Sequence, residues 1–541
     1  MAILPQLTKA LTKALSSLGY PKKEIKLSQP NNTNFGDLST NLPLTLSKNL
    51  NKNPMEIGEI IRNALILPDK LIDEVTVTKP GFLNFKIGNA YYYQVLADIL
   101  SNKQYGRNDF GKGQKANVEF VSANPTGPLT VGHGRNAVLG DTVSNLLEWN
   151  GYNVTREYYY NDAGKQMRVL GQSVEARYFE ILGKVLDLPE DGYEGNYIKV
   201  IAQTLINTHG DVLSVGNPIF KEEAEKTIFA DIEKSLLGLG IKFDQFTNEK
   251  TFYENGEIDK FLEELRLKNL IYEKDGATWF RSTALGKNQD RVYIKSSGEP
   301  TYRVPDTAYH RDKIKRGFDL IIDVFGADHT DTYPDVLLAL EALGVKTDHI
   351  RVLLYQFVTL IRGGKKVKMS TRKANYVTID ELVEELGSDV VRYFFIMRGM
   401  NSHLNFDLDL ATDQSEKNPI YYLQYAHARI CNIIKHGEDL DVLNTLDYDS
   451  TLLKNPSEIR LLKKLEKFPW IIENALHSLE PQTISSYLYD TANFFHKFYS
   501  DCRVLTDDIS LSAARIALVK GTKVVLGNGL DLLGITAPER M

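Results

Sequence analysis

Cysteine is almost absent from this chain of 541 residues, which contains only Cys431 and Cys502. So few cysteines exclude a disulfide framework and any zinc site built from several thiolates. Long apolar runs are also missing, so no segment of the sequence is predicted to span a bilayer. The residues after Met1 do not resemble a secretory signal, because Lys9 and Lys13 interrupt the apolar spacing and no small-residue cleavage site follows. From these absences we expect a cytoplasmic protein.

An excess of positive charge is missing as well. The chain has 64 lysines and arginines against 70 aspartates and glutamates, a net charge of −6. Taken alone, this balance argues mildly against nucleic-acid binding. A large protein needs only a local basic surface, however, so charge does not decide the question. Hydrophobic residues make up 43% of the chain, which is typical of a globular protein with an ample core.

The first 110 residues are expected to form a small α+β domain. Leu7, Leu11 and Leu15 repeat at helical spacing. Residues 75–87 alternate between apolar and polar side chains and turn at Pro80-Gly81, which predicts a β-hairpin. Glycines at 106, 111 and 113 then suggest a linker.

Residues 111–380 are expected to form a doubly wound, Rossmann-like α/β domain. A strand over 117–123, a Pro/Gly-rich loop over 124–128 and a helix with one apolar face over 139–150 follow one another. Strand, loop and helix in this order open a parallel nucleotide-binding sheet. Further strands are predicted at 320–325 and 351–356, and the stretch from about 170 to 290 is expected to be an insertion.

From about residue 380 the apolar spacing is helical to the end of the chain. We expect a connecting helical segment over 381–415 and an all-α bundle over 416–541.

Two segments far apart in sequence could bind a nucleotide. Gly132-His133 lies where the glycine-rich loop enters a helix, whose free N–H groups and dipole suit phosphate. His133 could donate to phosphate oxygens as charge builds. Residues 363–373 (GGKKVKMSTRK) form a glycine-hinged basic loop that could close cations onto a triphosphate. A structural turn and a solvated basic loop remain the alternatives for these segments.

Together these segments resemble the two signatures of class I aminoacyl-tRNA synthetases, at Pro125–His133 and Lys368–Thr371. The wider sequence resembles arginyl-tRNA synthetases over nearly the whole chain, and least specifically over the first hundred residues and 170–290. The segments that carry this resemblance are 122–128 (SANPTGP), 161–164 (NDAG), 326–329 (GADH), 418–429 and the terminal APERM at 537–541.

Two signature positions depart from the class I pattern. The first signature usually begins with His, where this chain has Thr130, and the second usually ends with Lys, where it has Thr371. Family members that lack this lysine often carry one just upstream of the first signature, but that position is Gly127 here. The cation that holds the departing phosphates therefore stays open among Lys368, Arg372 and Lys373.

The resemblance implies a set of site residues. The expected catalytic groups are His133, Lys368, Ser370 and Arg372. The expected ATP-binding residues are Pro128, Thr130, Gly132, His133, Gly326, Asp328 and Met369.

Arginine presents a planar, charged fork of N–H donors, so a selective pocket should offer carboxylates that accept paired hydrogen bonds. Such a pocket rejects lysine, whose single ammonium leaves acceptors unpaired. The resemblance places the guanidinium at Tyr302, Asp306 and Glu249. It places the amino and carboxylate end at Asn124 and His329, with Glu119 and Ser122 beside them. Alternatively, Asp306 could be a helix N-cap.

The resemblance also implies that the helical bundle holds the anticodon and that the N-terminal domain, with its Asn34–Asp37 turn, touches the tRNA elbow. Loop bases are usually bound by stacking on aromatics and by hydrogen bonds to their edges. Suitable groups lie on one segment, with Tyr421, Tyr425 and Arg429 as the candidate tRNA contacts and Tyr422 and His427 near them. Ordinary core packing is the alternative for each aromatic.

The expected reaction is ATP-dependent ligation of L-arginine to tRNA(Arg) through an arginyl-adenylate, with bound tRNA needed for the first step. Mg²⁺ is expected to arrive with ATP, and neither a structural metal nor a membrane contact is expected. The family is usually monomeric. A class I synthetase for another amino acid, a small-molecule nucleotidyltransferase and a catalytically inactive tRNA-binding paralogue are the alternatives.

Overall fold

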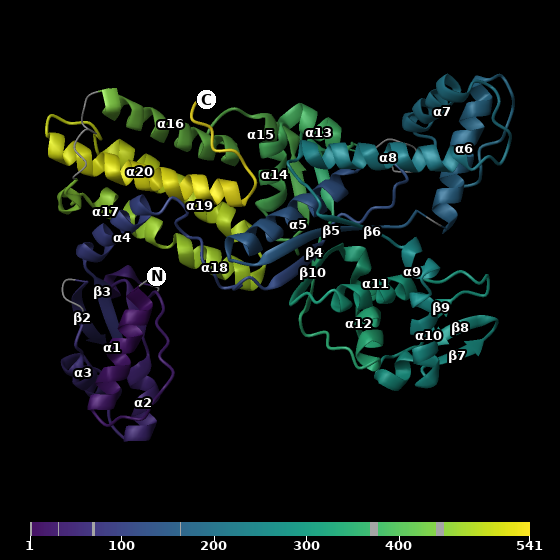
Figure 1. Cartoon of the computed structure of the whole chain (residues 1–541). Helices are drawn as coiled ribbons and strands as arrows, with labels where there is room; N and C mark the ends of the chain where they lie inside the picture. Colours follow the sequence, from purple (N-terminus) through teal and green to yellow (C-terminus); the bar gives the residue numbers. More distant parts are fainter. Residues whose placement is uncertain (1–2, 31, 68–70, 163, 368–376, 440–447) are drawn as a thin grey trace.

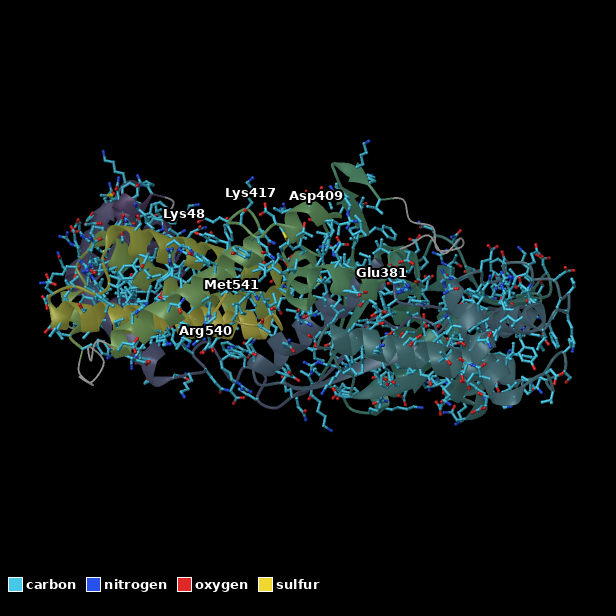
Figure 2. All side chains as sticks on the ribbon, turned by 90° about the horizontal axis from the view of Figure 1, so that it is seen from above. Lys48, Glu381, Asp409, Lys417, Arg540 and Met541 are labelled. Atoms are coloured by element: carbon cyan, nitrogen blue, oxygen red, sulfur yellow. The ribbon has the colours of Figure 1, made fainter. Side chains whose placement is uncertain are left out.

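The computed structural model describes residues 3–541 except 31, 68–70, 163, 368–376 and 440–447. Figure 1 shows an N-terminal unit hanging beside a long helical bundle, with an α/β region at the far end of that bundle. The view from above in Figure 2 shows the same elongated arrangement. No helix in the described part of the chain is long and apolar enough to cross a membrane.

The N-terminal unit combines helices with a small antiparallel sheet of order β1-β3-β2. Helix α1 (Ile3–Ser17) buries the apolar stripe that its spacing predicted, including Leu7, Leu11 and Leu15. The predicted hairpin is confirmed, because β2 (Ile72–Thr78) pairs antiparallel with β3 (Phe82–Ile87). The other elements are β1 (Leu38–Thr40), η1 (Thr33–Phe35), α2 (Leu42–Leu50), α3 (Pro54–Ala64) and α4 (Asn89–Ser101).

The central sheet is parallel throughout, with order β11-β10-β4-β5-β6. This confirms the doubly wound α/β fold. Its strands are β4 (Lys115–Glu119), β5 (Asn153–Tyr160), β6 (Gln245–Asn248), β10 (Leu320–Gly326) and β11 (Ile350–Tyr355). The first predicted strand was too long: β4 ends at Glu119, because Val121 and Ser122 take left-handed φ values of 64° and 44° that no strand can continue.

The order of the strands reverses between β4 and β10. From β4 the chain moves outward to β5 and β6, and it returns through β10 on the other side of β4 before reaching β11. In an open parallel sheet a ligand binds at the carboxyl ends of the strands where this reversal occurs. Helix α5 (Val131–Trp149) follows β4 directly and is buried on all faces, because it packs against the sheet as well as against α14, α18 and α20.

The stretch 170–290 is not a single insertion, because it supplies β6 to the central sheet. Before β6 lie α6 (Gly164–Ile181), α7 (Asn196–His209) and α8 (Ile219–Gly238), which pack on one another at one end of the molecule (Figure 1). After β6 comes a second group with its own antiparallel sheet of order β7-β8-β9. It consists of α9 (Lys250–Glu254), α10 (Glu257–Leu267), β7 (Ile271–Lys274), β8 (Ala277–Phe280), η2 (Ser282–Leu285) and β9 (Arg291–Ile294).

Three helices flank the last strands of the central sheet: α11 (Arg303–Lys315), η3 (Ala327–Asp331) and α12 (Tyr333–Ala342). The expectation of helix throughout residues 380–541 was wrong at one place. Strand β14 (Leu404–Asp407) pairs in parallel with β12 (Val358–Arg362), and β13 (Lys365–Lys366) completes this small sheet. Around it lie α13 (Ile379–Leu386), α14 (Ser388–Ile396) and α15 (Leu408–Thr412), and Figure 2 labels Glu381 and Asp409 in this middle part of the molecule.

The C-terminal region is the predicted all-α bundle. Its core is built from apolar faces at helical spacing, such as Ile484, Leu488 and Phe495 on one helix. The elements are α16 (Pro419–Asp439), η4 (Ser450–Leu452), α17 (Pro456–Glu466), α18 (Phe468–Ser478), α19 (Gln482–Asp501) and α20 (Ile509–Leu532).

Candidate active site

A tight turn at the carboxyl end of β4 brings three of the expected residues together. Glu119 ends the strand, and its Oε1 accepts a 2.9 Å hydrogen bond from the Ser122 hydroxyl. Ser122 Oγ accepts in turn from the backbone N–H of Tyr159 on β5, at 3.2 Å. The Asn124 side chain then bridges to the next loop, because its Oδ1 accepts from the backbone N–H of Asn161 at 3.1 Å. The turn is thus fixed between two neighbouring strands at the sheet's strand-order reversal.

The carboxylates predicted for the guanidinium lie close to this turn. Glu249 is buried at the start of α9, and it accepts hydrogen bonds from Tyr159 Oη at 3.1 Å and from Asn161 Nδ2 at 2.7 Å. Asp306 lies in the first turn of α11, and its backbone N–H bonds to the carbonyl of Tyr302. The alternative assignment of Asp306 as an N-cap was wrong, since Tyr302 occupies that position. Tyr302 is 63% exposed.

Burial raises the pKa of both predicted guanidinium ligands, Asp306 and Glu249. It raises the pKa of Asp306 to about 7, and the negative charges of Glu119 and Glu249 add to this effect. Burial likewise raises the pKa of Glu249 to about 7, against the opposing hydrogen bonds from Tyr159 and Tyr253. The charges of Glu119 and Glu249 thus act on the Asp306 carboxyl group, and a guanidinium bound beside Asp306 and Glu249 would offset them.

Several residues that the sequence predicts to bind the nucleotide lie at the beginning of α5. Thr130 is the N-cap: its hydroxyl accepts from the backbone N–H of His133, and His133 Nδ1 accepts from the backbone N–H of Thr130 at 3.3 Å. Burial lowers the pKa of His133, so the imidazole is neutral near pH 7 and keeps its N–H on Nε2. Thr130 thus caps the helix and orients His133. The sequence alone showed only that Thr130 replaces the histidine with which the first class I signature usually begins.

The glycines of α5 have different roles. A Cβ on Gly134 would lie 2.4 Å from Ile379, and a Cβ on Gly140 would lie 2.2 Å from Phe120. Both are therefore required by packing. A Cβ on Gly132 would meet only Thr130 Oγ1, at 3.6 Å. Open space at a helix N-terminus is the arrangement that an incoming phosphate needs.

Three more of the predicted site residues lie at the end of β10 and in the segment after it. Gly326 leads into η3, where the side chains of Asp328 and His329 are largely exposed and the His329 ring stacks on Phe325 at 5.1 Å. His329 and Asp306 both line a cavity of about 10 Å³, about the smallest that can hold one water molecule. The fold therefore brings residues predicted for the two ends of the substrate into one cavity.

Four predicted residues, Lys368, Met369, Ser370 and Arg372, lie outside the described residues, as do Thr371 and Lys373. Arg135 of α5 holds the backbone just before β12 and β14, the two paired strands of the small sheet. Its buried guanidinium donates to the carbonyls of Gln356 at 2.6 Å, Ser402 at 3.2 Å and Gly399 at 3.2 Å. Sequence reasoning missed Arg135, although an arginine two residues after His133 was a visible signal.

Sequence reasoning also missed a buried polar group beneath the pocket. Lys313 Nζ donates to Glu119 Oε2 and to Asp323 Oδ1, and His310 bonds Asp323 Oδ2 at 3.0 Å. Tyr309 stacks face to face on Tyr159, with ring centroids 4.2 Å apart. The signal in the sequence was the succession Tyr309-His310-Lys313 on the helix that carries Asp306.

The candidate tRNA contacts form a ladder along α16. Tyr421, Tyr425 and Arg429 are one helical turn apart and partly exposed, whereas Leu423, Ala426 and Ile430 are buried on the other face. The two tyrosine rings are nearly parallel, with centroids 6.4 Å apart, and the Arg429 guanidinium lies over Tyr425 at 5.3 Å.

Helix α19 extends this ladder with Tyr499, 4.7 Å beneath the Arg429 guanidinium, and with His496. Burial and the charge of Arg429 lower the pKa of His496 to about 4. His427 is not part of this surface. It is buried, and its Nδ1 bonds the carbonyl of Pro538 at 2.9 Å, so it fixes the C-terminal segment that carries Arg540 and Met541 (Figure 2).

Three family profiles match the chain in succession. The arginyl-tRNA synthetase N-terminal domain matches residues 5–87, the catalytic domain of class I tRNA synthetases (R) matches 95–393, and the DALR anticodon-binding domain matches 423–541. Among curated relatives, an arginine–tRNA ligase from Salinibacter ruber is 49% identical, covering 96% of each chain. One from Desulfotalea psychrophila is 49% identical, covering 97% of this chain and 96% of its own.

Solved structures agree with this result. A putative arginyl-tRNA synthetase from Campylobacter jejuni is 31% identical with a TM-score of 0.77, covering 84% of this chain and all of its own. The arginyl-tRNA synthetase of Thermus thermophilus has a TM-score of 0.75 over 99% of both chains, and at 22% identity it supports the fold alone.

Proposed function

The chain belongs to the arginyl-tRNA synthetase family, and we propose that it uses ATP to activate L-arginine as arginyl-adenylate and then transfers arginine to tRNA(Arg). The observation that supports this assignment is that Glu119, Glu249 and Asp306 gather near the carboxyl end of β4, where the strand order reverses and the chain continues into the N-terminus of α5. From this arrangement we infer a cation-binding pocket next to a phosphate-binding helix end. Arginine and ATP need these two environments side by side.

In the first step, the carboxylate of arginine attacks the α-phosphorus of ATP, and the bond to pyrophosphate breaks. The protein supplies no nucleophile, so it acts by positioning and by stabilising charge. The phosphates are held at the N-terminus of α5 by Pro128, Thr130, Gly132 and His133. The His133 Nε2–H can donate to them there. Gly326 and Asp328 form the opposite wall. The basic segment with Lys368, Met369, Ser370 and Arg372 is proposed to bind the departing pyrophosphate.

Mg²⁺ is proposed to enter the site bound to ATP. Within the described ranges, no group of three or more His, Cys, Asp or Glu side chains is placed to hold a metal ion. The phosphates of ATP would carry the ion, which neutralises part of their charge when bound.

Selectivity for arginine rests on Asp306 and Glu249, with Tyr302 at the rim of the pocket. Glu249 is buried and Asp306 is half-buried, and each carboxylate can accept from one edge of a guanidinium. A lysine ammonium would leave part of these acceptors unpaired in a buried site, which costs about 1–3 kcal/mol for each. Glu119, Ser122, Asn124 and His329 are proposed to hold the amino and carboxylate groups.

In the second step, a terminal ribose hydroxyl of the tRNA attacks the arginyl carbonyl, and AMP leaves. The ladder of Tyr421, Tyr425 and Arg429 is proposed to bind bases of the anticodon loop by stacking. The N-terminal unit is proposed to touch the tRNA elbow. A monomeric state, a cytoplasmic location and the domain boundaries stay predictions from the sequence.

Exchange of labelled pyrophosphate into ATP tests this function directly. The assay is run with and without total tRNA, and each other amino acid replaces arginine in a parallel reaction. Exchange with arginine alone, dependent on tRNA, is the expected result. Exchange with another amino acid would remove Asp306 and Glu249 as guanidinium ligands. Tight tRNA binding without any exchange would instead indicate an inactive paralogue.

A further inference from the structure

A fully buried lysine lies directly beneath the proposed arginine pocket. Lys313 is 0% exposed, and its ammonium contacts Glu119 Oε2 at 2.5 Å and Asp323 Oδ1 at 2.6 Å. It also lies 4.3 Å from the centroid of the Tyr309 ring. An ammonium has three N–H donors, so two carboxylates and one ring face satisfy it completely.

The fold requires a cation at this position. Glu119 and Asp323 are register partners on the adjacent parallel strands β4 and β10, at the point where the strand order reverses. Both are buried, so their charges would repel strongly in the absence of a counterion. Burial lowers the pKa of Lys313, but Asp323 and Glu119 outweigh burial and raise that pKa above its usual value. Lys313 therefore stays charged.

From Lys313 one line of contacts leads to the amino end of the pocket. Glu119 accepts from the Ser122 hydroxyl at 2.9 Å, and Ser122 has the left-handed φ of 44°. Residues other than glycine rarely adopt this conformation, so surrounding contacts must maintain it. Lys313 thus fixes the Glu119 carboxylate, and Glu119 in turn fixes the 121–124 turn that carries Asn124.

A second line of contacts leads to the guanidinium end. Asp323 Oδ2 lies 3.0 Å from His310 Nε2, and His310 Nδ1 lies 2.8 Å from the backbone carbonyl of Asp306. The first turn of α11, which carries Asp306, is therefore tied to the same buried ammonium. Lys313 is the one described cation that contacts both lines.

We propose that Lys313 is a positioning residue for L-arginine: its buried ammonium joins Glu119 to Asp323 and thereby sets the distance between the amino end and the guanidinium end of the pocket. Lys313 need not touch the substrate. The inference rests on the proposed function and deepens it, because it assigns the spacing of the pocket to a residue outside the ATP site. Substrate length is then selected by a contact inside the protein.

The test replaces Lys313 in the full-length enzyme and compares arginine with ATP. Lys313→Met should raise KM for arginine about tenfold or more in tRNA-dependent pyrophosphate exchange, because small displacements of positioning groups have large effects. KM for ATP should change less than about twofold, because the hydrogen bonds and ion pairs of Lys313 go to Glu119 and Asp323 rather than to α5 or η3. Canavanine, which has the same length as arginine, should lose affinity in parallel, whereas homoarginine, one methylene longer, should lose less.

A double variant separates positioning from folding. Lys313→Met with Asp323→Asn removes one positive and one negative charge, so it relieves the buried imbalance while Glu119 still lacks its partner. We expect its melting temperature to return toward that of the wild type while KM for arginine stays raised. Arg515→Met is the matched control, since it breaks a buried pair with Glu458 in the bundle. It should lower the melting temperature without a selective change in KM for arginine.

These measurements distinguish a positioning role of Lys313 from a purely stabilising one. Recovery of KM for arginine together with stability in the double variant would make Lys313 a stabilising residue only, and an unchanged KM in Lys313→Met would have the same meaning. Failure of both Lys313 variants to fold while Arg515→Met folds would also overturn the proposal. Absence of arginine-dependent exchange in the wild type would instead refute the proposed function, which is a distinct result.

Discussion

The carboxyl groups of Asp306 and Glu249 should make arginine binding to the proposed pocket depend on pH near neutrality. Asp306 and Glu249 each have a pKa raised to about 7, principally by burial. A guanidinium stays protonated at every pH in this range, and it pairs with the ionised form of each carboxyl group. Binding must therefore displace whatever protons these groups hold, and affinity rises as pH increases through 7.

The size of the effect follows from the ionised fractions. A group with a pKa of about 7 is roughly 9% ionised at pH 6 and roughly 91% ionised at pH 8. If arginine needs one ionised carboxylate, Kd falls about tenfold between these values, and if it needs both, about a hundredfold. The two groups repel each other, so they titrate as a pair and the transition broadens.

Isothermal titration calorimetry with arginine, tRNA and no ATP measures this dependence without the titration of ATP phosphates. Repeating the titration at pH 7 in buffers of different ionisation enthalpy counts the protons released. Asp306→Asn should bind arginine weakly, and the remaining slope with pH should report Glu249 alone. A Kd for arginine that is constant from pH 6 to 8, with no proton release, would refute the reasoning, because the pocket would then be ionised before arginine arrives.

Two further predictions concern the helix that follows β4 and the ladder on α16. Gly140→Ala should lower the melting temperature, because its Cβ would meet Phe120 at 2.2 Å, whereas Gly132→Ala should fold normally and raise KM for ATP. Equal melting temperatures for these variants would contradict the packing argument. Arg429→Ala should raise KM for tRNA about tenfold, equivalent to about 1.4 kcal/mol of stacking near Tyr425, with KM for arginine unchanged. Unaltered kinetics with tRNA would exclude this face as an RNA contact.

The elements of the fold could largely be predicted, because local sequence carries their signals. Helical spacing in α1 and in the bundle, the hairpin at Pro80-Gly81 and the order strand, loop, helix around residue 120 all depend on neighbours within a few positions. The predictions failed where distant pairing decides the structure. Strand β14 forms because β12 offers it an edge, and β6 joins the central sheet from within a stretch expected to be an insertion.

The site shows the same division in more detail. The sequence by itself determined which residue types are present: a glycine-rich helix start with His133, acidic residues at 119, 249 and 306, and a tyrosine ladder one turn apart on α16. Only the tertiary structure decided that Lys313 lies between Glu119 and Asp323, and that His427 faces the C-terminal segment rather than solvent. The physical reason is that burial, ionic partners and pKa depend on groups brought together from separate strands and helices, and spacing along one chain does not record those distances.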